Sequence, residues 1–403
     1  MEIYWFWFLV RLTLLTVGVS AAHYYVWRRL VRDTTRLGSI PRRAATTTMV
    51  VLLIVYLISR FTTPSLLPHW FQQLVAWPGQ IWFTIFACLL AALLGAEPIR
   101  WWLRRRDTAQ ASLNPAPASC EEPAGISRRV LLSRSIAVAA TVPALAATGY
   151  GLYEGFRTPR YKYLEVTLAK LDAATDGYRI AIISDMHLSA LRGADFCQRV
   201  VDAVNATRAD LIVLVGDMVD GDVEGLEHAA APLGELQARE GVFFVTGNHE
   251  YYYSGVDHWV EHLSSLGLVP LQNVRTSLAG FDLAGVNDVD VWKNSPGDVG
   301  PDYDAALGGR DEQRAVVLLS HQPVEVDQAV RRGVDLQLSG HTHGGQIFPN
   351  NLISGFSNPT ASGLWTKGDT TLYVTNGVGT SGPPVRLGVP SEITVMTLRS
   401  PNS

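Results

Sequence analysis

Hydrophobic residues are distributed unevenly along the 403-residue chain, and their pattern changes near residue 153. Before this point, long apolar runs alternate with arginine-rich segments. After about Lys162, short apolar runs alternate with polar motifs and with amphipathic segments. Long runs are typical of helices that cross a membrane, whereas short bounded runs are typical of buried strands. The sequence therefore predicts two domains, a membrane region at 1–153 and a soluble α/β domain at 160–400.

Four segments of the membrane region are apolar enough to form helices in a bilayer. Each of the first three is near the ~20 residues that cross the hydrocarbon core, although the second is short. Aromatic residues near their ends, such as Trp77 and Trp101, suit the membrane interface. Buried helices of a soluble bundle are the alternative. The segments are Tyr4–Trp27, Ala44–Ile58, Leu74–Ala96 and Ile136–Leu152.

The fourth segment is preceded by a pair of arginines, Arg128 and Arg129, in the run S-R-R-V-L-L. Two arginines before a mildly apolar segment resemble a twin-arginine export signal, although such signals stand at the N-terminus of a chain. Ala144–Ala146 is compatible with signal-peptidase cleavage, and retention as a membrane anchor is the alternative. The composition of Asn114–Gly125, just before this segment, predicts a flexible linker.

Arginines are concentrated in two of the segments that join the apolar runs. Six lie between the first and second runs and seven between the third and fourth, whereas 60–73 contains only Arg60. By the positive-inside rule, both arginine-rich segments are cytoplasmic. The sequence therefore predicts a multi-pass protein of the cell membrane, with its N-terminus and its soluble domain on the extracytoplasmic side.

In the soluble domain, each of five polar motifs follows a predicted strand. Because ligand sites of α/β proteins collect at the carboxyl ends of strands, we expect these motifs to meet. Strands at Ile180–Ile183, Leu211–Val215, Val242–Thr246, Ala315–Leu319 and Val334–Leu338 precede D-M-H, G-D-M-V-D-G, G-N-H-E, S-H-Q-P and S-G-H-T-H-G-G-Q. Further strands are predicted at Tyr163–Leu168, Leu372–Thr375 and Glu392–Leu398, and helices at Ala194–Thr207, Glu227–Arg239 and Asp257–Leu266.

These motifs supply seven candidate metal ligands. Carboxylate, amide and imidazole groups together suit Mn, Fe or Zn, whereas Ca or Mg would want fewer histidines. Seven ligands are too many for one tetrahedral ion and suit two ions that share a carboxylate. Two such ions clamp the attacking and leaving oxygens at phosphorus and lower the pKa of a bound water. The candidate ligands are Asp185, His187, Asp217, Asn248, His321, His341 and His343.

Other polar residues near these motifs are assigned supporting roles. His249 lies next to a candidate ligand and is placed to protonate a leaving oxygen. Asp220 and Glu250 are predicted to orient ligands rather than to bind metal. Two features of the C-terminal segment stay open. The glycine-rich run Asn376–Gly382 is either a structural turn or part of a phosphate pocket, and Arg386 either neutralises substrate phosphate or forms an ordinary salt bridge.

The ordered motifs D-x-H, G-D-x-x-D, G-N-H-E, H-Q-P and G-H-T-H-G-G resemble those of the calcineurin-like metallophosphoesterases, and especially of their membrane-associated bacterial branch. The resemblance covers roughly Tyr163–Arg399. It implies a four-layer α/β sandwich of two mixed β-sheets flanked by helices, here preceded by a transmembrane helical region. It also implies a first metal on Asp185, His187 and His343, a second on Asn248, His321 and His341, a bridging Asp217, and His249 as the acid.

The expected function is therefore that of a membrane-anchored phosphoric ester hydrolase. It would use two divalent or mixed-valence transition-metal ions and a metal-bound hydroxide to cleave phosphate ester or diphosphate bonds. About ten residues separate the last apolar segment from the first strand, which favours a lipid-linked or envelope substrate. A soluble phosphorylated small molecule is the alternative, because anchoring also serves enzymes with soluble substrates. The alternative is a non-catalytic sensor or scaffold that keeps the metals for stability. A net charge of −4 predicts no nucleic-acid partner.

Overall fold

The computed structural model describes residues 2–61, 69–113, 128–252, 255–291, 297–348, 350–352 and 354–401. The chain divides into two compact units by its internal contacts. We call them the helical unit, Met1–Phe61 with Leu74–Tyr150, and the α/β unit, Thr62–Gln73 with Gly151–Ser403.

The helical unit consists of long helices that follow the predicted apolar segments. They are α1 (Glu2–Trp27), the π-helical turn η1 (Arg28–Arg32), α2 (Ile40–Phe61), α3 (His69–Gly95), α4 (Glu97–Leu113) and α5 (Arg128–Phe156). The first residues of α3, up to Gln73, and the last residues of α5, from Gly151, belong to the α/β unit. Among the residues described here, three stretches are long and apolar enough to cross a membrane, namely Ile40–Ser59, Trp70–Leu103 and Val130–Phe156. The first predicted span forms α1, in which residues 2–12 are described for their backbone only.

Helix α4 corrects the sequence analysis, which treated this stretch as part of an arginine-rich loop. Its sequence contains many good helix formers, and Glu97 in the first turn suits the positive end of the helix dipole. Arg105 lies 3.9 Å from the ring centroid of Trp101, four residues earlier, so the pair stabilises the helix. The predicted linker Asn114–Gly125 lies outside the described residues.

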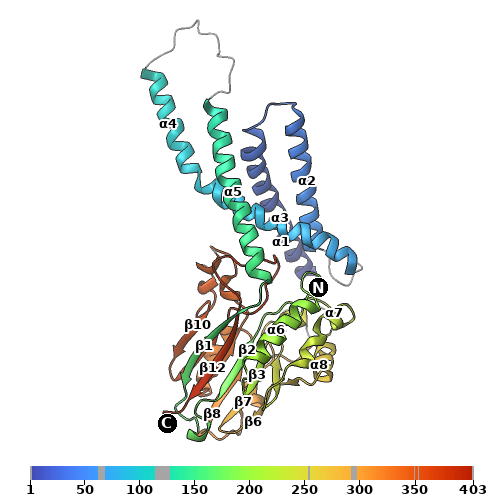
Figure 1. The fold of residues 1–403 in the computed structure, drawn as a ribbon, viewed down its shortest axis with the longest axis vertical. Helices are drawn as coiled ribbons and strands as arrows, with labels where there is room; N and C mark the ends of the chain where they lie inside the picture. The colour runs from blue at the N-terminus through green and yellow to red at the C-terminus, as the bar shows by residue number, and fades with distance from the viewer. Residues whose placement is uncertain are drawn as a thin grey trace. The chain divides into compact units, whose positions relative to one another are not determined.

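The α/β unit is built on two six-stranded mixed sheets, several of whose strands are labelled in Figure 1. In the first sheet, β2 to β5 run parallel and β12 runs antiparallel to β2. In the second, β6 and β10 are antiparallel strands at the two edges. The first sheet comprises, in order, β1 (Arg160–Thr167), β12 (Glu392–Arg399), β2 (Arg179–Ile183), β3 (Leu211–Val215), β4 (Val242–Val245) and β5 (Val269–Pro270). The second comprises β10 (Gly363–Lys367), β11 (Thr370–Val374), β9 (Leu336–Ser339), β8 (Ala315–Leu319), β7 (Phe281–Gly285) and β6 (Val274–Ser277).

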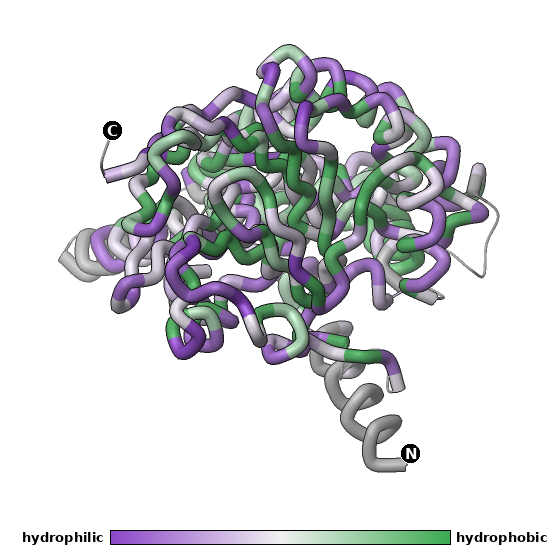
Figure 2. Tube along the Cα trace, turned by 90° about the horizontal axis from the view of Figure 1, so that it is seen from below, coloured by the Kyte–Doolittle hydropathy of each residue, from purple (hydrophilic) through white to green (hydrophobic). Residues whose placement is uncertain are grey.

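The strands are apolar on both faces because each face of a sheet meets a different layer. On β2, Ile180 lies in the core between the two sheets, while Ile183 faces the helices outside the first sheet. The outer face of the second sheet is covered by α10 (Tyr303–Leu307) and α11 (Val326–Arg331). Figure 2 shows the hydrophobic strands inside and more hydrophilic residues along the surrounding loops. The predicted four-layer fold is confirmed.

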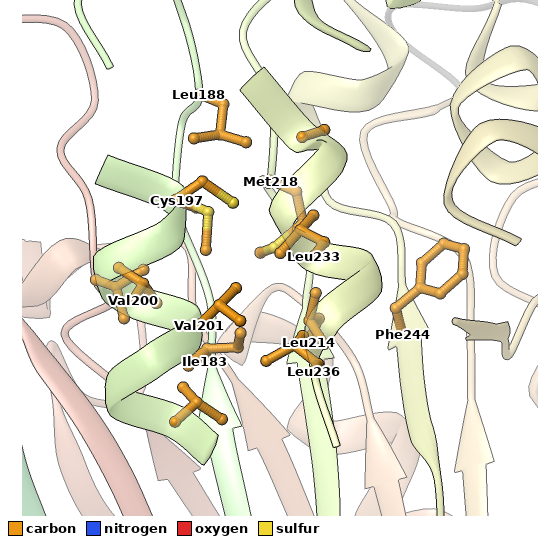
Figure 3. Packing of buried hydrophobic residues seen from close by; sticks show 14 of the residues in the cluster. Ile183, Leu188, Cys197, Val200, Val201, Leu214, Met218, Leu233, Leu236 and Phe244 are labelled. Carbon is orange, nitrogen blue, oxygen red and sulfur yellow. The ribbon is translucent and has the colours of Figure 1, made fainter. Parts of the chain in front are cut away.

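Three helices and a 3₁₀ segment cover the outer face of the first sheet. They are α6 (Ala194–Ala206), α7 (Val223–Ala230), η4 (Ala231–Glu235) and α8 (Val256–Ser265). Figure 3 shows Val200 and Val201 of α6 in the same buried cluster as Ile183 of β2 and Leu214 of β3. This packing fixes the strands whose ends carry the polar motifs.

Helix α7 is shorter, and begins earlier, than the helix predicted at Glu227–Arg239. It begins after Asp222, whose side chain accepts a hydrogen bond from Gly225 N at 2.9 Å and caps the helix. It gives way to the 3₁₀ segment η4 at Ala231, because the following Pro232 has no N–H to continue the α-helical pattern.

Candidate metal centre

The ends of β2, β3, β4, β8 and β9 bring the five polar motifs together at one edge of the two sheets. Three groups of their side chains place ligand atoms within 4.8 Å of one another. Asn248 joins them, since its Oδ1 lies 2.9 Å from His341 Nδ1. The three groups are Asp185, His187 and His343; His187, Asp217 and His249; and Asp217, His321 and His341. The structure therefore places all seven predicted ligands, and His249, in one cluster.

The backbone at these motifs is strained. Of the eight non-glycine residues with positive φ in the described part of the chain, five are candidate ligands, with φ between 49° and 70°. Such left-handed conformations persist only where the surrounding structure enforces them, and they are concentrated at functional sites. The five are Asp185, His187, Asp217, His341 and His343.

Glycines allow the motif loops to approach one another closely. A Cβ on Gly247 would lie 2.5 Å from the backbone nitrogen of Asp217, which is well inside van der Waals contact. A Cβ on Gly340 would overlap Ser184 Oγ and the carboxylate of Asp185. Glycine is therefore required at both positions for the candidate ligands to meet.

Asp220 orients two imidazoles with a single oxygen. Its Oδ1 lies 2.7 Å from Nδ1 of His187 and 2.7 Å from Nδ1 of His249. Because a carboxylate can only accept, both Nδ1 atoms donate, and this leaves each Nε2 facing the cluster. Burial lowers the pKa of His249, but Asp217 and Asp220 outweigh burial and raise that pKa to about 9.

The donor set fits bound metal ions. His321 donates through Nδ1 to Val215 O at 2.7 Å. Its buried Nε2 makes no hydrogen bond within the described residues, although Asp217 Oδ2 lies 3.2 Å away. The Nε2 atoms of His187 and His343 also lie only 3.0 Å apart. A buried imidazole nitrogen without a hydrogen bond, beside imidazole nitrogens that face one another and a carboxylate, is the geometry expected of metal ligands.

The charges of this cluster also favour cations. Asp185 and Asp217 are both buried, and burial raises the pKa of Asp185. Burial raises the pKa of Asp217 too, but His321 and His249 outweigh it and hold that pKa well below its usual range. Two buried carboxylates are unfavourable unless positive charge compensates for them, and bound metal ions would supply that charge.

Comparison with known proteins identifies the family. A family described as calcineurin-like phosphoesterase matches residues 178–345. A protein of Danio rerio named transmembrane protein with metallophosphoesterase domain is 32% identical over 402 residues, which are 93% of this chain and 86% of the relative. This chain belongs to the calcineurin-like metallophosphoesterases.

Two further relatives agree with this identification. The Bos taurus protein of the same name is 35% identical over 332 residues, which are 79% of this metallophosphoesterase and 72% of the relative. A Helicobacter pylori metallophosphoesterase is 38% identical over a region that is 64% of this chain and 70% of the relative. The predicted family and the predicted enzyme class, a metal-dependent phosphoesterase, are confirmed. The transmembrane relatives and the three long apolar helices indicate membrane association.

In this metallophosphoesterase, Glu250 holds two motif loops together. Its carboxylate accepts hydrogen bonds from the backbone nitrogens of Asp217 (3.0 Å), Met218 (2.6 Å) and Gly247 (2.7 Å). Val219 N lies at 3.3 Å from the same carboxylate. Because no oxygen of Glu250 is left free for a metal, its side chain orients the loops, as the sequence predicts.

Arg386 does not form the ordinary salt bridge that is one of its two interpretations from the sequence. It is buried and forms no ion pair with a described carboxylate. Its guanidinium donates to the carbonyl oxygens of Asn376 (2.6 Å) and Gly379 (2.8 Å). It also approaches His343 Nδ1 at 3.5 Å. Arg386 therefore anchors the glycine-rich loop behind the metal centre, which supports a structural role for that loop.

Tyr252 was not identified by sequence reasoning. Its hydroxyl accepts a hydrogen bond from Asn248 Nδ2 at 2.8 Å, which turns Asn248 Oδ1 toward the cluster. Its ring centroid lies 4.7 Å from that of His249. The only local signal is its place two residues after the G-N-H-E motif, in a run of three tyrosines.

Proposed function

We propose that this metallophosphoesterase hydrolyses phosphate ester or diphosphate bonds at a centre of two metal ions. The observation that carries the proposal is the position of Asp217, which belongs to two of the three ligand groups and so can bridge two ions. In this assignment, Asp185, His187 and His343 hold the first ion, and Asn248, His321 and His341 hold the second.

The donor set suits Mn, Fe or Zn, as carboxylate, amide and imidazole ligands do in general. Two such ions supply Lewis-acid polarisation of the phosphoryl group and a nucleophile near neutral pH. The protein itself contributes position and a proton. His249 Nε2 faces the cluster, and Asp220 fixes the ring through Nδ1, so His249 is placed to donate a proton to the leaving oxygen.

We further propose that the α/β unit is extracytoplasmic. The arginines concentrated in η1 and α4 support this orientation through the positive-inside rule. Substrates on that side of the membrane would be phosphorylated molecules of the envelope, either carried by a lipid or soluble.

Asp217→Asn tests the metal assignment. Loss of the shared charge should remove metal from the purified chain and lower hydrolysis of bis(p-nitrophenyl) phosphate by orders of magnitude. Asp202→Asn, on the exposed side of α6, is the matched control and should change neither quantity. Wild-type turnover by Asp217→Asn would refute the assignment.

His249→Ala separates an enzyme from a metal-keeping scaffold. As an acid, His249 should be needed for rate but not for metal content, so the variant should keep its metals and lose about 10²–10⁴-fold in hydrolysis. Unchanged hydrolysis would show that His249 is not the acid. The measurement is metal analysis and turnover on the same preparation.

A further inference from the structure

The last turn of α5 from Gly151 onward, which belongs to the α/β unit, is packed tightly against a loop of the same unit. Gly151 and Gly155 are four residues apart and lie on the same face of the helix. A Cβ on Gly151 would lie 3.1 Å from Leu387 Cδ2, and one on Gly155 would lie 2.5 Å from Pro384 O. Arg386 N donates a hydrogen bond to Gly151 O at 3.0 Å. The helix end and this loop therefore form one fixed piece.

Helix α5 also indicates where the bilayer surface lies. Its candidate span, Val130–Phe156, has 27 residues and is therefore about 40 Å long, more than the ~30 Å of the hydrocarbon core. Tyr150 and Tyr153 are 54% and 61% exposed, as expected for aromatic residues at the membrane interface. The next residue, Glu154, forms ion pairs with two arginines. A helix that spans the bilayer and has these residues at its end would meet the bilayer surface at the turn that packs against the loop.

Two large apolar side chains are exposed beside this attachment. Phe348 is 62% exposed and Leu352 is 64% exposed. The backbone nitrogen of Phe348 donates to Leu387 O at 2.9 Å, so Phe348 is paired with the residue whose side chain touches α5. Exposed phenylalanine and leucine are unfavourable in water and favourable in a lipid interface.

The same two residues lie in a loop that follows the candidate metal-binding motif at 341–345 and returns to contact that motif at Thr342. Phe348 follows His343 by five residues, so the two lie within about 18 Å. Beyond Leu352, Ala361 O accepts a hydrogen bond from Thr342 Oγ1 at 2.6 Å, next to the candidate ligands. The loop that carries Phe348 and Leu352 therefore lies close to the rim of the metal centre.

We propose that Phe348 and Leu352 insert into the surface of the bilayer that holds α5. The occupant is lipid because Phe348 is paired through its backbone with Leu387, which packs against the end of a helix apolar enough to cross the membrane. Leu352 follows Phe348 by four residues in the same loop. The rim of the metal centre then lies at the lipid headgroups. The insertion assigns the substrate class, and this assignment rests on the proposed function. The substrate is a phosphate ester or diphosphate whose phosphate is joined to a membrane lipid.

Nitroxide labelling of the full chain in lipid vesicles tests the insertion. Cys88 and Cys120 are changed to Ser, and the label is attached at Phe348→Cys or, as a second exposed position, at Leu352→Cys. Cys197 can stay, because it is fully buried and burial raises the pKa of its thiol to about 12, so it does not react near neutral pH. The expected result is frequent collision of the label with oxygen and rare collision with a water-soluble nickel complex.

The matched control is Val274→Cys. Val274 is an exposed apolar residue of β6, which Figure 1 places at the end of the α/β unit away from the end of α5. Its label should collide freely with the nickel complex. Access of the nickel complex to position 348 equal to that at position 274 would overturn the proposal. Shielding of the label from both reagents would also overturn it, because it would show a protein partner there. Spin–spin broadening between labels would overturn it by showing a second copy of the chain.

The double variant Phe348→Ser, Leu352→Ser tests the substrate class. Its hydrolysis of water-soluble bis(p-nitrophenyl) phosphate should equal that of the wild type. Its kcat/KM toward phosphatidic acid or CDP-diacylglycerol in phosphatidylcholine vesicles should fall by about tenfold or more. Equal activity on both kinds of substrate would overturn the lipid assignment while leaving the phosphoesterase intact. Absence of diester and lipid hydrolysis in the wild type would instead refute the proposed function.

Discussion

At the scale of single residues, neighbouring carboxylates of this site have different tasks because their surroundings differ. Asp217 lies among three histidines, and Asp220 touches two of them. Glu250 instead meets backbone N–H groups from the loops after β3 and β4. Burial raises the pKa of Glu250 to about 7, while its hydrogen bonds to Gly247 and Met218 favour the charged form. Position in the loops, rather than residue type, separates ligand from support.

Glu250→Gln should loosen the metal centre without removing a ligand. The glutamine side chain has an NH₂ group in place of one carboxylate oxygen, and this group cannot accept hydrogen bonds from the backbone N–H groups. Each buried N–H that loses its acceptor lowers the free energy of unfolding by about 1–3 kcal/mol. We expect a lower unfolding midpoint and weaker metal binding, measured by thermal unfolding and by titration with Mn or Zn. Glu227→Gln, on the exposed face of α7, is the control. Wild-type stability of Glu250→Gln would contradict the clamping role.

At the scale of elements, α5 connects the apolar part of the chain to the α/β unit. The sequence ends this segment at Leu152, but the helix continues to Phe156, and its last turn packs against residues 384–387. Gly151 and Gly155 make this close approach possible. Their role is invisible locally, because glycine in a helix is otherwise unfavourable by about 1 kcal/mol relative to alanine.

Gly155→Ala should separate the helix end from this loop. The added Cβ would lie 2.5 Å from Pro384 O, so we expect a loss of about 1–3 kcal/mol in unfolding free energy and faster protease cleavage at the helix end. Among described atoms, none lies within 4 Å of a Cβ on Gly149, so Gly149→Ala should be neutral or stabilising by up to ~1 kcal/mol. Equal behaviour of the two variants would show that the contact is not tight.

At the scale of the whole molecule, the metals should stabilise the fold as well as act in hydrolysis. The candidate ligands come from five separate strand ends, so ions bound there would connect both sheets. They would also compensate for the buried carboxylates of Asp185 and Asp217.

Removal of metal by a chelator should therefore lower the thermal unfolding midpoint of the purified chain. A ligand present at 100 times its dissociation constant stabilises a fold by about 2.7 kcal/mol, and the apo-protein lacks this contribution. Addition of Mn or Zn should restore the midpoint, and Asp217→Asn should respond less than the wild type. Identical midpoints with and without chelator would contradict a structural contribution of the metals.

The proposed orientation of the chain predicts a difference in chemical labelling. Cysteines introduced at Leu37, in the first arginine-rich segment, and at Val299, in the α/β unit, replace exposed residues. A membrane-impermeant maleimide added to intact cells should label Val299→Cys and leave Leu37→Cys unmodified, whereas both should react after lysis. The opposite pattern in intact cells would reverse the orientation.

The sequence by itself determined the features that depend on neighbouring residues. Continuous apolar runs such as Leu211–Val215 predicted strands buried on both faces, and the structure has β3 at those residues. The ordered motifs resembled those of a known family, and that resemblance implied the fold. The ligand set was named from the motifs alone, and the structure brings those side chains together, although their metal binding stays a prediction.

The tertiary structure decided what depends on contacts between distant parts of the chain. β7 was not predicted, because Asp282 interrupts its apolar pattern. Ion pairs with Arg314 (3.1 Å) and Arg275 (3.4 Å) make that buried aspartate tolerable. The role of Arg386 stayed open for the same reason, since its partners are carbonyl groups of a folded loop. Local patterns fix which elements form, whereas the partners of buried polar groups and the packing of glycines are set only when the chain has folded.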